Sequence, residues 1–261
     1  MLGLNFTIMF RPRVIPVLLL KNLGLVKSVG FKNYTYIGDP MNAVRIYNQM
    51  KADELVFLDI EATKQNRLIS LDFVREVGEE ANMPFAVGGG IKTIDDIRLV
   101  TSAGAEKVII NSAAADIKFI ENAANEFGSS TIVVCIDVKK KLFGGLKTWI
   151  NNGQKSTSYN PVEFANLMEE SGAGELIIQS IDRDGKMEGY DVDLIRSISE
   201  AVSIPVIALG GAGNIEHMKE AAQKGFANGL AAGSMFVYQG ANKGVLINYL
   251  SQKDKKYFNY H

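Results

Sequence analysis

An acid at the end of an apolar segment is the first candidate for chemistry in this sequence. Asp137 directly follows the stretch "TIVVCI" at residues 131–136, whose apolar character predicts dry surroundings. Loss of water penalises a charged carboxylate and raises its pKa, which suits the group to general acid or base catalysis. The alternative is a structural role, in which Asp137 pairs with Lys139 or with a cation from a loop. Aligning the segments "VLLLK" and "CIDVK" as copies of one repeat places Leu19 opposite Asp137, so one copy lacks the acid.

Two glycine-rich segments, "VGGGI" at residues 87–91 and "LGGAG" at residues 209–213, each follow a predicted strand. Glycine lets backbone N–H groups approach an anion closely, and a following helix N terminus adds positive potential. One such segment alone is equally well a turn or a helix end. Two in repeated positions, each beside a strand that ends in small residues, predict two phosphate sites around one mouth. The residues predicted to bind phosphate are Gly89, Gly90, Asn111, Ser112, Asp184, Gly185, Gly210, Gly211, Gly213, Ala232 and Gly233.

The polar segment "SIDRDGKMEGYD" at residues 180–191 contributes Asp184 and Gly185 to that prediction. Asp182 and Arg183 are further candidates for ligand contacts. The alternative is a solvated turn that ends at Gly185. The length and charge of the segment after a predicted strand favour a ligand-binding loop.

Charged residues open four of the eight predicted strands, namely the first, second, fourth and sixth. In a barrel, alternate strands supply one layer of inward side chains, so two cations and two anions at these positions predict a charged ring at the floor. The alternative is a set of ordinary surface charges, but the recurrence of charge at the starts of the second, fourth and sixth strands favours the ring. The four residues are Arg13, Glu54, Lys107 and Glu175.

The elements that must position these residues are short apolar strands that alternate with amphipathic helices. Near-continuous apolar strands are typical of a parallel sheet that is buried on both faces. Segments such as "MPFAVGGGI" and "IPVIALGGAG" recur at an offset of about 120 residues, which indicates a duplicated (βα)4 half-barrel. We therefore predict a single (β/α)8 TIM barrel domain over residues 13–261, preceded by an N-terminal arm, residues 1–12, that need not be ordered. The strands are predicted at residues 13–19, 54–59, 84–87, 107–110, 131–136, 175–179, 205–208 and 228–231. The helices are predicted at residues 40–52, 71–81, 94–105, 117–128, 161–173, 191–202 and 214–226.

Composition narrows the class of protein. The 261 residues, 47% of them hydrophobic, suffice for one large barrel, and a net charge of -1 gives no electrostatic reason to bind nucleic acid or an anionic membrane. The longest apolar run is far shorter than the roughly 20 residues that span a bilayer. The start of the chain lacks a basic region, so no secretory signal is expected. With one cysteine, Cys135, and two histidines, His217 and His261, we expect no metal, no cofactor and a cytoplasmic location.

Nearly the whole chain, from Arg13 to about Tyr249, carries segments that together resemble one family. They are "RVIP", "FKNYTYIGDP", "ADELVFLDIEA", "PFAVGGGI", "AEKVIINSAA", "CIDVK", "GAGELIIQSIDRDG" and "VIALGGAG". The family is HisF, the cyclase subunit of imidazole glycerol phosphate synthase, a lyase of histidine biosynthesis. The resemblance implies a TIM barrel with two phosphate sites and a glutaminase docked at the N-terminal face of the barrel. Ammonia from that glutaminase would pass through the barrel to a bis-phosphate substrate, which is cleaved and cyclised.

The resemblance also assigns roles to particular residues. The family's ammonia gate falls on the four charged strand starts, and its two acid–base aspartates fall on Asp137 and on the position of Leu19. Three positions where the family usually has small hydroxyl residues are Ile109, Gln179 and Leu209. Further pocket residues are predicted to be Lys27, Asp59 and Gln179, although helix capping is the alternative for Asp59.

Leucine cannot transfer a proton, and transfer by a placed side chain contributes about 10²–10⁴-fold in rate. We therefore predict a HisF paralogue that keeps the ammonia conduit but cyclises poorly. The resemblance implies that such paralogues serve amidino-sugar pathways, so the expected partners are a HisH-like glutaminase, a phosphorylated small molecule and a sugar amidotransferase. One alternative is an authentic cyclase in which Asp59 or Asp184 replaces the missing acid. Another is a non-catalytic, phosphate-binding activator of the glutaminase. Residues 140–156 form either a lid or a plain hairpin.

Overall fold

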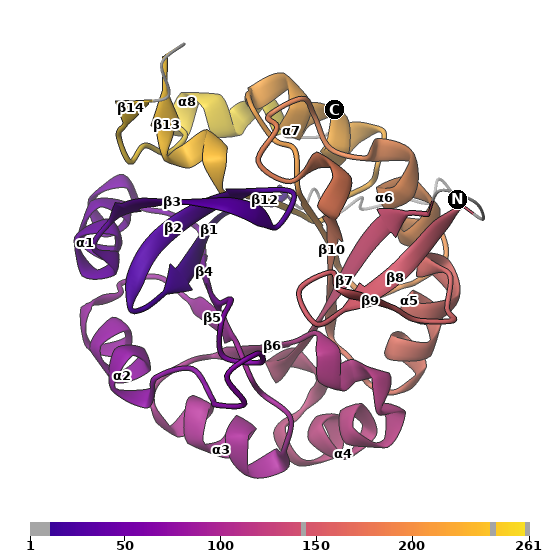
Figure 1. Ribbon diagram of the computed structural model, residues 1–261. Coiled ribbons are helices and arrows are strands. Elements are labelled where there is room, and N and C mark those ends of the chain that lie inside the picture. Colours follow the sequence, from indigo (N-terminus) through magenta and orange to yellow (C-terminus); the bar gives the residue numbers. More distant parts are fainter. Residues whose placement is uncertain (1–10, 142–144, 241–243, 259–261) are drawn as a thin grey trace, which may run out of the picture.

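A computed structural model describes residues 11–141, 145–240 and 244–258. Within these residues, eight strands pair in parallel with their neighbours and close into a ring, which Figure 1 shows end on. The predicted (β/α)8 TIM barrel is confirmed. In chain order, the barrel strands are β1 (Arg13–Lys21), β4 (Leu55–Asp59), β5 (Phe85–Gly88), β6 (Lys107–Ile110), β7 (Ile132–Lys140), β10 (Glu175–Ser180), β11 (Val206–Leu209) and β12 (Gly229–Ala232).

Helices surround the ring of strands (Figure 1). They are α1 (Pro40–Met50), α2 (Leu71–Glu80), α3 (Ile94–Ser102), α4 (Ile117–Phe127), α5 (Pro161–Glu170), α6 (Val192–Ser199), α7 (Ile215–Gln223) and the short α8 (Gln252–Lys255). Each begins after a side chain that accepts a backbone N–H of the first turn, as Ser, Thr, Asp and Asn do at helix starts. The capping residues are Asp39, Ser70, Thr93, Asp116, Asn160, Asp191, Asn214 and Ser251.

Shorter elements join and flank the barrel. The 3₁₀ helices are η1 (Ser112–Ala115), η2 (Ser129–Thr131), η3 (Ile181–Arg183), η4 (Ser234–Phe236) and η5 (Lys256–Phe258). The strands outside the barrel ring are β2 (Gly24–Val29), β3 (Lys32–Gly38), β8 (Leu146–Ile150), β9 (Lys155–Ser156), β13 (Tyr238–Gln239) and β14 (Gly244–Val245).

Strands β1 and β7 are longer than the sequence predicted, because each runs beyond the barrel into an antiparallel hairpin. Leu19 pairs with Val26 of β2, and Asp137 pairs with Trp149 of β8. The hairpin that follows β7 accounts for most of the predicted 140–156 segment, of which residues 142–144 lie outside the described residues. Matching hairpins after the two repeated strands accord with a duplicated half-barrel.

The alternation of side chains along each strand separates two apolar cores. Leu18 belongs to the core between strands and helices, whereas Ile15 and Val17 belong to the core inside the barrel. Arg13 and Leu19 have the same parity as Ile15 and Val17, so all four point into the barrel. One strand therefore places a charge at the floor and a leucine at the top.

The predicted N-terminal arm lies outside the described residues except for its last two. Of these, Arg11 donates from Nη2 to Oδ1 of Asp53 at 2.9 Å, next to the start of β4. No helix in the described part of the chain combines the length and the apolar character that crossing a bilayer requires.

Candidate functional site

The four charged strand starts meet inside the barrel floor. Lys107 donates from Nζ to Oε2 of Glu175 at 2.9 Å and to Oε1 of Glu54 at 3.3 Å. The Arg13 guanidinium bonds the same two carboxylates, one with each terminal nitrogen. Cations and anions thus alternate around a closed ring, as the recurrence of charges in the sequence predicted.

Burial and charge oppose each other in this ring. Burial raises the pKa of Glu54, which is only 3% exposed, and Arg13 and Lys107 oppose that rise without cancelling it. For Arg13, burial lowers the pKa, but Glu175 and Glu54 outweigh it and the net direction is upward. Two positive and two negative groups in mutual contact make a neutral closure across the floor.

Above the ring, the barrel interior is apolar. Its buried side chains separate the charged floor from the opposite end, where the strands end at their carboxyl termini. The members are Ile15, Val17, Val56, Ala86, Ile109, Val133, Cys135, Ile177, Ile207, Leu209 and Ala231, with Leu19 and Leu58 partly buried against them.

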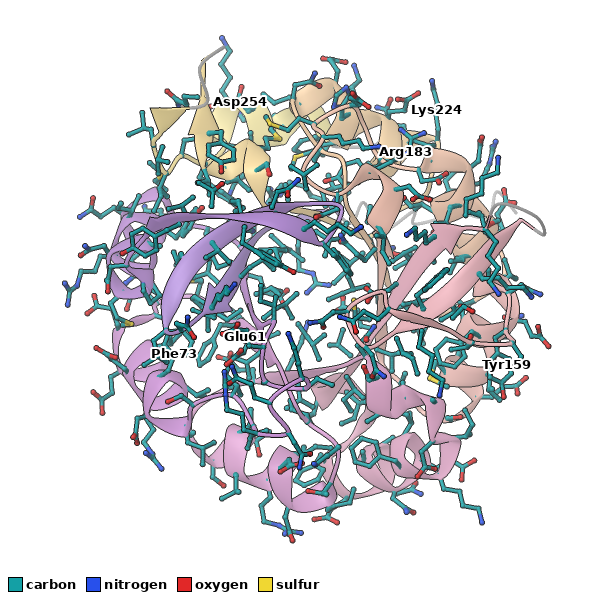
Figure 2. The ribbon with its side chains drawn as sticks, viewed as in Figure 1. Glu61, Phe73, Tyr159, Arg183, Lys224 and Asp254 are labelled. Atoms are coloured by element: carbon teal, nitrogen blue, oxygen red, sulfur yellow. The ribbon has the colours of Figure 1, made fainter. Side chains whose placement is uncertain are left out.

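A cavity of about 390 Å³ opens at the carboxyl ends of the strands, within the range usual for small-molecule sites. In Figure 2, side chains converge on the central opening near Glu61, whereas Lys224 and Asp254 lie at the outer rim. The predicted site residues that line the cavity are Leu19, Lys27, Asp59, Gly89, Gly90, Asn111, Ser112, Asp137, Gln179, Asp184, Gly210, Gly211, Ala232 and Gly233.

Two residues predicted to bind phosphate, Gly185 and Gly213, are not part of this lining. A Cβ atom on Gly185 would lie 2.0 Å from the carbonyl oxygen of Ser28, so this glycine faces the hairpin after β1. The N–H of Gly213 donates to Nδ1 of His217 at 3.2 Å. Both backbones therefore meet neighbouring protein atoms and not the cavity.

The glycine-rich segment after β5 fits against the loop after β4. Gly90 has a φ of +73°, and a Cβ atom there would lie 1.8 Å from the carbonyl oxygen of Arg67. Asp59 anchors the same loop, because its carboxylate accepts the N–H of Ala62 at 3.1 Å and Nη1 of Arg67 at 2.6 Å. Asp59 thus fastens a turn, whereas helix capping was the structural alternative predicted for it.

The strand end after β6 completes this side of the cavity, which we call the first cup: Gly89, Gly90, Asn111 and Ser112. Asn111 donates from Nδ2 to the carbonyl of Cys135 at 2.9 Å. The backbone N–H of Asn151 donates to Oγ of Ser112 at 3.0 Å, which ties the hairpin after β7 to the first cup.

Sequence reasoning missed several polar residues of the cavity lining on this side, among them Arg67, Lys92 and Asn152. Lys92 directly follows the "VGGGI" segment, which was a usable signal. Asn152 carried no local signal, because only the fold of the hairpin brings it to the mouth.

The opposite side, which we call the second cup, consists of Gly210, Gly211, Ala232 and Gly233, and two charged residues lie beside it. Lys27 donates from Nζ to the carbonyl of Val17 at 2.6 Å, and burial lowers its pKa to about 8, opposed by the charge of Asp184. Burial likewise raises the pKa of Asp184, against hydrogen bonds that include one from Ser28 Oγ at 2.8 Å and one from Gln179 Nε2 at 3.3 Å.

Asp137 lies between the two cups at the top of β7. It is 6% exposed, and burial raises its pKa to about 7 in spite of hydrogen bonds from Cys135 and Asn111. The structural alternative does not match the contacts, because Lys139 places its Nζ 5.3 Å from the ring centroid of Trp149. Leu19 lines the same cavity. The site therefore combines one carboxyl group able to exchange a proton near neutral pH with an apolar residue at the repeated position.

Comparison with known proteins shows what the chain is similar to. The family model described as "Histidine biosynthesis protein" matches residues 13–243. The chain is 44% identical to a Pseudomonas aeruginosa protein named "Putative imidazole glycerol phosphate synthase subunit hisF2", over 92% of this chain and 96% of that one. It is 42% identical to "Imidazole glycerol phosphate synthase subunit HisF" of Streptococcus mutans, over 88% of this chain and 92% of that one.

Proposed function

The chain belongs to the HisF family of imidazole glycerol phosphate synthase subunits, and on that premise we propose that it conducts ammonia for an acceptor other than the family's cyclase substrate. One observation carries the proposal: the charged ring is intact at the floor, while Leu19 faces the same cavity as Asp137. The means of admitting ammonia is kept, and half of the proton-transfer pair is gone.

The route begins at the N-terminal face, where a glutaminase partner of the HisH type would dock. Arg13, Glu54, Lys107 and Glu175 would act there as a gate that opens for ammonia. The apolar interior above them favours a neutral molecule, since an ion without a partner pays a large desolvation penalty in such surroundings. Ammonia, in contrast to ammonium, would pass.

The cavity at the carboxyl ends of the strands is better suited to passing ammonia on than to cyclising a substrate. Part of the cavity lining is apolar and consists of Leu19, Leu58, Ile109 and Leu209. These side chains offer a polar substrate no hydrogen bonds. Asp137 would be left to exchange protons without a second acid. We propose that ammonia passes these four apolar side chains and leaves for a sugar-modifying amidotransferase. The two cups would hold a phosphorylated small molecule.

Turnover of the bis-phosphate cyclase substrate with free ammonium tests the proposal. Loss of one acid–base group predicts turnover about 10²–10⁴-fold below that of a relative with both aspartates. Leu19→Asp should restore part of the lost turnover. Leu19→Asn should not, because asparagine has the size of aspartate but cannot exchange a proton. Turnover by the unaltered chain at the rate of such a relative would overturn the proposal.

An authentic cyclase is the second candidate, and Asp184 favours it. This carboxyl group lines the same cavity, and burial raises its pKa. Asp59 fits the substitute role less well, because Arg67 and two backbone N–H groups occupy its oxygens. If Asp184 replaces the missing acid, the unaltered chain turns the substrate over rapidly and Asp184→Asn abolishes the reaction.

A further inference from the structure

The charged ring at the barrel floor lies beyond the backbone ladder that joins β1 to β4. That ladder pairs residues 17–20 of β1 with residues 56–59 of β4. Arg13 and Glu54, which bond each other in the charged ring, both precede its first pair. The ladder therefore does not fix the distance between these two strand starts, and other contacts set how closely they approach.

Asp53, the residue before Glu54, reaches across to the start of β1. Its Oδ2 accepts the backbone N–H of Val14 at 2.9 Å. Its Oδ1 accepts Nη2 of Arg11 at 2.9 Å and Nζ of Lys255 at 2.8 Å. Burial alone would raise the pKa of Asp53, but these hydrogen bonds outweigh burial and the net direction is downward. Asp53 is thus an ionised link between the two strand starts.

Tyr249, from the C-terminal part of the chain, makes a second link between the same strand starts. Its hydroxyl donates to the carbonyl of Val14 at 2.8 Å and accepts the backbone N–H of Asp53 at 3.0 Å. Its aromatic ring lies edge-on to that of Tyr47, with centroids 6.2 Å apart, and 5.4 Å from that of Phe236. Because this packing fixes where the hydroxyl lies, one oxygen atom holds the backbone of both strand starts.

Helix α8 joins these two links through Lys255. This side chain is 3% exposed, and its Nζ donates to Asp53 and also to the carbonyl of Lys51 at 3.2 Å. The same Nζ lies 4.5 Å from the ring centroid of Tyr249. A buried charge is tolerated when it is paired and hydrogen-bonded, as this one is. Asp53, Tyr249 and Lys255 therefore form one connected cluster, which we call the clamp.

We propose that the clamp positions the charged ring. Val14 follows Arg13 in the chain, and the backbone of Val14 is held on both its N–H and its carbonyl. Asp53 precedes Glu54, and its backbone N–H is held by the same hydroxyl. The clamp thereby fixes the points from which the two ring side chains start. Its members act through these neighbours, so they are positioning residues and not catalytic ones.

Small displacements are enough to give such a role an effect. Misplacing a functional group by about 1 Å, through a change far from it, can cost about 10²-fold in rate. The inference rests on the proposed function only in taking the charged ring as an ammonia gate. The positioning itself is a property of the chain alone and is tested on the chain alone.

A double-mutant cycle tests the positioning. Tyr249→Phe keeps the aromatic ring and removes the hydroxyl, and Glu54→Ala removes one carboxylate of the charged ring. Tyr249→Phe should destabilise the unaltered chain more than it destabilises the Glu54→Ala variant, because the pair of Arg13 with Glu54 is already absent from that variant. In urea denaturation, the factor by which Tyr249→Phe raises the equilibrium constant of unfolding should be at least about threefold smaller with Glu54→Ala.

Tyr190→Phe is the matched control. The Tyr190 side chain is 3% exposed, and its hydroxyl donates to the carbonyl of Ala231 in β12 at 2.9 Å. It also bonds the backbone of a barrel strand, but Ala231 adjoins none of the four ring residues in the chain. The effect of Tyr190→Phe should be the same with and without Glu54→Ala, since separate sites act independently. If Tyr249→Phe behaved in this way too, the inference would be overturned.

The consequence for conduction is measured in the complex with the proposed glutaminase partner. The fraction of glutamine-derived ammonia that reaches the acceptor side, as opposed to bulk solvent, should fall with Tyr249→Phe and stay unchanged with Tyr190→Phe. A fall with Glu54→Ala but not with Tyr249→Phe would overturn the inference. A fall with neither, together with the expected coupling in urea, would support the positioning and remove the gate from the proposed function.

Discussion

Glu54 bonds both cations of the charged ring, so its removal tests the proposed gate directly. Glu54→Ala leaves Arg13 and Lys107 to share Glu175 and gives the ring a net positive charge. Breaking a buried ion pair typically costs about 3–5 kcal/mol. Here the side chains of Arg13 and Lys107 stay 32% and 23% exposed and keep one carboxylate, so solvent screens part of the loss. We expect the free energy of unfolding to fall by about 2 kcal/mol.

Glu126→Ala is the matched control. Glu126 pairs with Arg98, which also keeps a second carboxylate, Asp95, after the change. Both partners are exposed, at 53% for Arg98 and 42% for Glu126, and exposed ion pairs contribute little to stability because water screens them. Urea denaturation of the two variants compares the stability lost when a glutamate is removed from the buried ring with the stability lost when one is removed from the exposed surface. Equal losses would refute the buried ring.

The functional assay uses the complex with the proposed glutaminase partner. Glutamine hydrolysis and the fraction of ammonia that reaches the acceptor side, as opposed to bulk solvent, are measured together. Glu54→Ala should reduce that fraction, because the closure across the floor is broken, while Glu126→Ala should not. An unchanged fraction with Glu54→Ala would remove the gate assignment even if stability falls as expected.

Two more predictions concern stability. The pKa of Asp137 rises to about 7 in the fold, so the folded state binds its proton more tightly than the unfolded state, and stability falls as pH rises from about 4 to about 7. The free energy of unfolding of Asp137→Asn should therefore equal that of the unaltered chain near pH 4 and exceed it near pH 8, by an amount on the order of 4 kcal/mol. If the stability of both proteins changed with pH in the same way, this prediction would be contradicted. Gly90→Ala should destabilise more than Gly128→Ala, because both have positive φ but only at Gly90 would the Cβ meet a carbonyl, that of Arg67, at 1.8 Å. Equal midpoints in urea would contradict that placement of the loop.

Much of the barrel could be predicted because strand patterns are local. The predicted strands begin within a residue of those in the fold, since near-continuous apolar segments bounded by turn residues mark strands buried on both faces. Helix ends were placed too late: the segment predicted at 191–202 ends as α6 at Ser199, because its last residues form the turn that leads into β11. The hairpin after β1 was missed because its partner strand lies beyond polar residues that looked like a strand end, whereas the hairpin after β7 was one of the two alternatives predicted for residues 140–156.

The candidate site divides in the same way. The ring of Arg13, Glu54, Lys107 and Glu175 was predictable, because the parity of a strand fixes which face a side chain takes and the recurrence of charge fixes the layer. The participation of Asn152 was not, because a hairpin far along the chain carries it to the mouth. Nor was the role of Asp59, whose oxygens are occupied by a loop that only folding brings back to it.

By itself, the sequence determined the barrel, its repeated halves, the charged layer and the leucine at position 19 opposite Asp137 in the repeat, because each of these is written in spacing, parity or residue type. The tertiary structure decided which glycines face the cavity and which, like Gly185 and Gly213, meet other loops. It also decided that Lys27 is buried beside Gly233, with its Nζ bonded to the carbonyl of Val17. Contacts of this kind join residues far apart in the chain, and their distances depend on how the closed ring of strands and its loops pack.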